Sequence, residues 1–100
     1  EALVLLQGRV SLLTFDDAGV VLQRLELSRA NGILVVETTA DTWHSLVATE
    51  PDSALFELKQ GPFAPSEFAD WAPMEGSPDA GRIAAWLGDA RPGDRFESGA

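Results

Sequence analysis

Residues 9–27, RVSLLTFDDAGVVLQRLEL, indicate a β-hairpin and establish the fold class. Two apolar runs flank the four-residue loop DDAG, in which Gly19 occupies the position most suited to a positive φ. In the second run the side chains alternate, with Val21, Gln23, Leu25 and Leu27 on one face and Val20, Leu22, Arg24 and Glu26 on the other. A period of two is typical of β-strands, so we expect two paired strands here.

A similar pattern of short strands and turns extends through residues 1–60. Short apolar segments recur about every ten residues between turn-forming residues, a pattern that favours a sandwich or barrel over βαβ units. We expect strands at residues 2–6, 9–15, 20–27, 33–37, 43–49 and 54–59. Because Glu1 opens directly onto an apolar run, we also expect the barrel to be incomplete at the N-terminus. Such a truncation predicts an open sheet edge near residues 2–15.

The alternation stops after residue 60. Residues 61–76 are rich in Pro and Gly but carry three aromatic residues, Phe63, Phe68 and Trp71, so we expect an ordered strap across the barrel.

A short helix is expected at residues 77–88. Ser77 is a suitable N-cap, Pro78 suits the first helical position, and Ile83, Trp86 and Leu87 have the spacing of one apolar face. We interpret Trp71 and Trp86 as packing residues. The polar residues 89–100 are expected to form a flexible tail of the same single domain.

Composition excludes several classes of partner. The chain has 100 residues and a net charge of −9. An acidic surface repels phosphate backbones and anionic lipids, so we expect neither a nucleic-acid nor a membrane partner. Cysteine is absent, which excludes disulfides and thiolate chemistry and fits a reducing, cytoplasmic location. The aliphatic runs are far shorter than the ~20 residues that span a bilayer.

The candidate functional residues are few. His44, the only histidine, begins an expected strand, and imidazole is a common ligand for transition metals. Taken alone, His44 is either such a ligand or a surface histidine held by a hydrogen bond. Glu57 and Lys59 share one face of the last expected strand with Leu55. They are either an acid and a base lining a pocket or a solvated ion pair on an edge strand.

Four segments resemble the cupin superfamily, and in particular the WbuC-type cupin metalloproteins, which are often associated with bacterial surface-polysaccharide gene clusters. These segments are EALVLLQG (1–8), TWH (42–44), ELKQGPF (57–63) and FADWAPMEG (68–76). Glu1 and Gly8 match the end of the first cupin motif, and His44 matches the histidine of the second. The chain departs from the pattern in residues 39–41, which lack Pro and Gly, and at Ala48, where cupins often have Asn.

The resemblance implies an all-β, cupin-like jelly-roll barrel with a metal site. Glu1 and His44 are the implied ligands, and two further histidines are expected upstream of Glu1. The implied cofactor is a divalent transition metal, Zn, Fe or Mn, which two protein ligands bind weakly or not at all. We expect Glu1 and His44 to lie on neighbouring strands and to point into one barrel mouth. Glu57 is expected to face the same cavity.

The implied function is to bind or act on a small sugar-like or carboxylate ligand, with Glu57 and Lys59 as candidate catalytic groups. Two alternatives stay open. One is a metal-free cupin sugar epimerase or isomerase, with His44 as general base and Lys59 as electrostatic stabiliser. The other is a non-catalytic sensor or ligand-binding barrel. Metal content separates the epimerase from the others, and turnover of a sugar separates an enzyme from a sensor. The oligomeric state is also open, a homodimer included.

Overall fold

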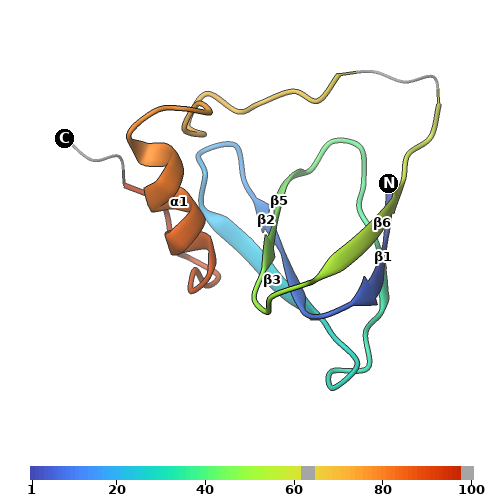
Figure 1. Ribbon diagram of the computed structural model, residues 1–100. Helices are drawn as coiled ribbons and strands as arrows, with labels where there is room; N and C mark the ends of the chain where they lie inside the picture. Colours follow the sequence, from blue (N-terminus) through green and yellow to red (C-terminus); the bar gives the residue numbers. More distant parts are fainter. Residues whose placement is uncertain (62–64, 98–100) are drawn as a thin grey trace.

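The computed structural model describes residues 1–61 and 65–97, and Phe63 of the expected strap lies outside them. Six strands are followed by one helix (Figure 1): β1 (Ala2–Gln7), β2 (Val10–Phe15), β3 (Val21–Leu27), β4 (Val35–Glu37), β5 (Trp43–Ala48), β6 (Ala54–Leu58) and α1 (Asp79–Leu87). The six expected strands are all present, and their ends differ from the expected ones by at most two residues. The prediction of a mainly β fold is therefore confirmed.

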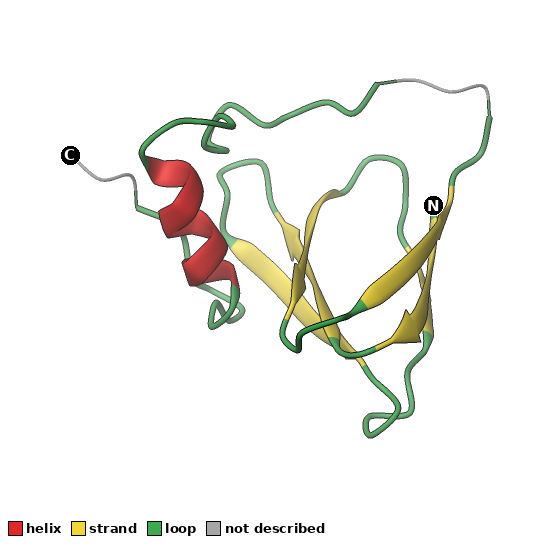
Figure 2. Cartoon of the chain, viewed as in Figure 1, coloured by secondary structure: helices red, strands yellow, loops and turns green. Residues whose placement is uncertain are grey.

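The strands form two antiparallel three-stranded sheets, β4-β1-β6 and β3-β2-β5 (Figure 2). β1 and β2 are the central strands, each hydrogen-bonded on both sides. The prediction of an open edge near residues 2–15 is therefore wrong, because the free edges belong to β3, β4, β5 and β6. In the part of the chain that the structure describes, the two sheets are not joined into a closed barrel.

The first hydrophobic core fills the space between the sheets. Leu3 and Leu5 of β1 meet Leu12 of β2 there, and partly buried apolar side chains from four other segments surround them: Ile33, Val36, Leu46 and Leu55. Leu3 is fully buried. Since side chains alternate along a strand, this core fixes the inner face of each strand.

The second core lies on the other side of the β3-β2-β5 sheet, where α1 packs against it, and the residue 65–76 segment runs past the loop ends of the strands before the chain enters α1 (Figure 1). Leu13 and Phe15 of β2 pack there with Leu87, and Ile83 and Trp86 lie at the periphery. The predicted apolar face of the helix is thus confirmed. Trp71 also packs as expected, with its ring 5.1 Å from that of Phe15 and 6.5 Å from that of Trp43.

The prediction that Val21, Gln23, Leu25 and Leu27 share one face is wrong at Val21. A register shift opposite Thr14 and Phe15 places one extra residue, Leu22, in β3. Val21 consequently joins the second core, whereas Leu27 belongs to the first. A bulge of this kind exchanges the two faces of a strand.

The segment after α1 is anchored to β3. Val20 and Arg95 form an antiparallel bridge, Val21 donates a backbone hydrogen bond to Asp94, and Ala90 is buried. The expected flexible tail is therefore a docked segment as far as Arg95. The expected Ser77 cap is also wrong, because no side-chain hydrogen bond caps α1 and the Ser77 hydroxyl is buried with no hydrogen-bond partner in residues 1–61 and 65–97.

Candidate functional site

Glu1 is held in place by the start of the β1–β4 ladder. Its terminal ammonium group donates to the Thr38 carbonyl at 3.1 Å, and the Thr38 N–H donates back to the Glu1 carbonyl at 2.8 Å. Two residues further on, Leu3 points into the core between the sheets. Glu1 therefore directs its carboxylate to the same inner face, at the end of that core.

His44 reaches the same place from the opposite sheet. It pairs with Thr14 in the β2–β5 register, two positions before the Leu12–Leu46 pair. Leu46 packs against the first core, so His44 also points inward. The side-chain alternation of β5 expected from the sequence is thus the observed one.

The Glu1 and His44 side chains meet across the space between the sheets. His44 Nε2 lies 3.2 Å from Glu1 Oε1, and the side chains are 27% and 18% exposed respectively. The prediction that the two residues lie on neighbouring strands is wrong, since β1 and β5 belong to different sheets. The contact instead links the two sheets.

Glu57 of β6 and Lys59, which directly follows this strand, extend the cluster. Lys59 Nζ lies 4.0 Å from Glu1 Oε2 and 3.4 Å from Glu57 Oε1. Both side chains are close to half-exposed, as expected for an ion pair on an edge strand. Lys59 also lines the adjoining cavity, whereas Glu57 is not among its lining residues, which differs from the expectation for Glu57.

The surroundings of Glu1 favour its ionised form. Partial burial alone raises the pKa of this carboxyl, but the hydrogen bond with Glu57, the charges of His44 and Lys59, and the His44 hydrogen bond together lower the pKa below its ordinary value. Glu1 is therefore an anion at neutral pH and available to a cation.

A cavity of about 680 Å³ opens beside the pair. Residues 40–44, residues 65–68 and Asp17 form most of its wall, and Glu1 and Lys59 complete it. Trp43 contributes an indole whose N–H donates to Asp17 at 3.0 Å. The volume is within the range of about 300–1,000 Å³ found for small-molecule sites.

The metal-binding atoms of this pair, Glu1 Oε1 and His44 Nε2, are close enough together to bind one divalent cation. Nδ1 of His44 faces the Thr42 carbonyl at 3.1 Å, while Nε2 faces the Glu1 carboxylate. Both neighbours are acceptors, so a neutral imidazole satisfies only one of them, whereas a charged ring, the form that lowers the pKa of Glu1, donates to both. With Nδ1–H donating to Thr42, a cation beside Nε2 satisfies the other. Two atoms that bind the same tetrahedral zinc ion at about 2.0–2.2 Å lie roughly 3.3–3.6 Å apart, and the observed 3.2 Å is just below this range.

This arrangement supplies a cation with two ligands from the described residues, Glu1 and His44. Among the described residues, no group of three or more His, Asp or Glu side chains is arranged to hold a metal ion. Lys59 adds a positive charge beside Glu1, which opposes the binding of a cation.

Several residues of the cavity were not singled out from the sequence. Asp17, Asp41, Glu67 and Ser66 come from loops, where no periodicity distinguishes a lining residue from any other exposed residue. Phe68 was expected to pack in the strap, but its side chain is 83% exposed and lines the cavity. In the sequence, the one indication that Phe68 lines a cavity was its position in a Pro-rich segment beside acidic residues.

Comparisons with protein-family models, with curated proteins and with solved structures find no match for this chain. No helix among the described residues is both long enough and apolar enough to cross a membrane.

Proposed function

We propose that this chain is a cupin-like domain, with a jelly-roll derived fold and a strap formed by residues 61–76, that binds a small sugar-like ligand beside a divalent transition metal. Glu1 and His44 are the metal ligands supplied by this chain. The observation that carries the proposal is the 3.2 Å contact between His44 Nε2 and Glu1 Oε1, made between two sheets at the wall of a cavity.

Each residue of the cluster has a distinct role in this proposal. Thr42 orients the His44 ring through its carbonyl, as partners of ligating histidines commonly do. Glu1 is kept ionised by its neighbours. When bound, the metal acts as a Lewis acid or as an anchor for ligand oxygens. Lys59 stands at the cavity wall, where its ammonium group donates hydrogen bonds to ligand hydroxyls.

The charge of the cavity wall favours a neutral ligand over a carboxylate. Asp17, Asp41, Glu67 and Glu1 line the cavity, opposed by Lys59. A ligand carboxylate meets this excess of negative charge, whereas hydroxyl groups donate to carboxylates. The aromatic rings of Trp43 and Phe68 offer apolar surface to the ring face of a sugar.

A metal titration tests the proposal. Chelator-treated protein is titrated with Zn²⁺ or Mn²⁺ at neutral pH by calorimetry, and the ring protons of His44, the only histidine, are followed by NMR. We expect weak binding that shifts the His44 signals and falls at least tenfold in Glu1→Gln and His44→Ala. Glu75→Gln, an exposed carboxylate outside the site, is the matched control and leaves the affinity unchanged.

Lys59→Met sharpens the test. Removal of the ammonium group beside Glu1 lowers the repulsion felt by a cation, so this variant binds the metal several-fold more tightly. Unchanged affinity in His44→Ala, with no shift of its signals in the wild type, places any bound metal elsewhere and contradicts the proposal.

The Glu1–His44 contact also favours a second candidate function, a metal-free sugar epimerase or isomerase. A carboxylate that accepts from one ring nitrogen is the usual means of orienting a histidine base. Turnover of a sugar that persists in chelator and is lost in His44→Ala supports this candidate. Ligand binding without turnover supports a sensor barrel.

A further inference from the structure

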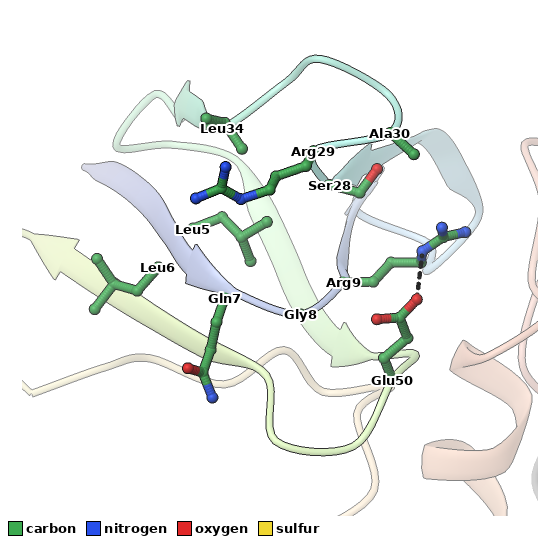
Figure 3. A pocket seen from close by; sticks show the side chains of 10 residues that line it. All are labelled: Leu5, Leu6, Gln7, Gly8, Arg9, Ser28, Arg29, Ala30, Leu34 and Glu50. Carbon is green, nitrogen blue, oxygen red and sulfur yellow. Dashed lines mark ion pairs between the residues drawn. The ribbon is translucent and has the colours of Figure 1, made fainter.

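A second cavity lies at the opposite end of β1 from Glu1. It has a volume of about 560 Å³ and is formed where the β1–β2 turn meets the loop after β3 (Figure 3). Its wall includes Gly8 and Arg9 of the turn, residues 28–30 of the loop, and Glu50. None of these residues takes part in the Glu1–His44 site.

Most polar groups of this cavity already have partners. Arg9 lies 3.3 Å from Glu26 and 3.3 Å from Glu50, so its charge is compensated twice. The Ser28 hydroxyl accepts from the Asn31 backbone N–H at 3.0 Å. Gln7 donates its side-chain amide to the Asp52 carbonyl. These groups form the frame of the cavity and offer little to a ligand.

The guanidinium group of Arg29 is different. Within residues 1–61 and 65–97 its side chain has no hydrogen bond or ion pair. In Figure 3 it extends toward Leu5 and Leu34, whereas the head group of Arg9 points the other way, to Glu50. Its five N–H donors therefore face the open cavity next to aliphatic side chains.

The aliphatic wall is unusually exposed. Leu6 is 58% exposed and Leu34 is 41% exposed, and both line this cavity. A ligand that covers them gains roughly 25 cal/mol per Å² of apolar surface removed from water. An unpaired cation beside exposed leucines selects a ligand with an anionic head and an aliphatic tail.

We propose that this cavity binds a carboxylate carried by a short aliphatic chain, with Arg29 as the residue that recognises the carboxylate. The guanidinium fork matches a carboxylate in two parallel hydrogen bonds, and the tail packs on Leu6 and Leu34. The ligand is a short-chain fatty acid or the C-terminal carboxylate of an aliphatic residue. The net charge of −9 opposes the approach of anions, so the binding is weak.

Titrations of the chain with matched probes, followed by amide NMR and calorimetry, test this proposal. Hexanoate is compared with hexanol, which lacks the charge, and with acetate, which lacks the tail. N-acetyl-leucine represents a peptide C-terminus, so its affinity relative to hexanoate distinguishes the two sources. We expect hexanoate to bind at least fivefold more tightly than either control, with shifts at Gly8, Arg29 and Leu34.

Variants separate recognition from folding. Arg29→Gln loses the preference of hexanoate over hexanol, and Leu34→Ser loses its preference over acetate. Arg91→Gln, an arginine outside this cavity, leaves both unchanged, and so does His44→Ala, which keeps the test independent of the metal site. Equal affinity for hexanol and hexanoate, shifts confined to the Glu1–His44 cavity, or an Arg29→Gln variant that binds like the wild type each overturns the proposal.

Discussion

Glu57 of β6 stands opposite Leu3 of β1 in the sheet register, so a carboxylate shares the inner face with a fully buried leucine. The next inward pair along the same two strands is Leu5–Leu55, which belongs to the first core. The inner face therefore changes from apolar to charged within one pair of residues. The charged end holds Glu1, His44 and Lys59, and the apolar end holds the two sheets together.

The change in the free energy of unfolding on substitution of Leu3 measures how much the first core stabilises the fold beside the site. Leu3→Ala is expected to lower the free energy of unfolding by about 2–5 kcal/mol, the usual range for a buried leucine. Leu58→Ala, in the neighbouring β6 but half-exposed, is the control and costs less than about 1 kcal/mol. Urea unfolding followed by tryptophan fluorescence gives both values. Equal losses would contradict the assignment of Leu3 to the core.

The lowered pKa of Glu1 predicts a specific loss of stability in acid. A carboxyl whose pKa is lower in the folded than in the unfolded state, as for Glu1, stabilises the fold above its unfolded pKa, which is about 4.3 for Glu. That contribution is lost as the pH falls through the folded pKa. We expect Glu1→Gln to lose less stability than the wild type between pH 5 and pH 3, values chosen to bracket that pKa.

The measurement is urea unfolding at both pH values in the presence of a chelator. Glu97→Gln, an exposed carboxylate remote from the cluster, serves as control and follows the wild-type pH dependence. If the wild type and Glu1→Gln lose the same amount of stability in acid, the folded neighbours of Glu1 do not favour its charged form.

Gly19 of the hairpin loop is expected to be more sensitive to substitution than Gly32. Its φ is +88°, and a Cβ at this position would lie 2.9 Å from the Trp71 ring. Gly32, with φ of +74° and nothing within 4 Å of a Cβ, isolates the backbone effect. We expect Gly32→Ala to cost about 1–2 kcal/mol, and Gly19→Ala about 1–3 kcal/mol more because of crowding against Trp71.

Thermal unfolding of the two glycine variants, with near-UV circular dichroism to report on Trp71, provides the comparison. A Gly19→Ala variant as stable as Gly32→Ala would show that Trp71 does not rest on this loop.

Arg24 is expected to hold the end of α1 against β3. Its guanidinium group donates to the carbonyls of Leu87 at 2.6 Å, Gly88 at 2.9 Å and Ala90 at 3.0 Å, and to the Ser11 hydroxyl at 3.2 Å. Arg24→Gln should cost about 1.5–3 kcal/mol, since carbonyls at a helix C-terminus lose a charged donor. Arg82→Gln, which breaks a pair with Asp79, a 3.4 Å hydrogen bond to the Glu97 carbonyl and a contact with the Phe96 ring near the surface, should cost less than Arg24→Gln.

Hydrogen exchange of the α1 amides distinguishes a local from a global effect in these arginine variants. Faster exchange confined to α1 and residues 88–95 is expected for Arg24→Gln. Unchanged exchange there would mean that packing of Leu87 and Ala90 alone holds the helix in place.

The strands, the Gly19 turn and the apolar face of α1 were all predictable from the sequence. Alternation, turn chemistry and helical spacing act between residues a few positions apart, so a linear pattern carries them. The resemblance of Glu1 and His44 to cupin ligands was also visible in the sequence, although only as a match of motifs.

The tertiary structure alone decided which strands pair and where the faces point. It made β1 and β2 central, moved Val21 to the helix side through one bulge, and docked residues up to Arg95 on β3. It also brought Glu1 to His44 across 43 residues and from another sheet. Such contacts depend on the summed packing of two sheets, because no local pattern records which distant segment shares a buried face.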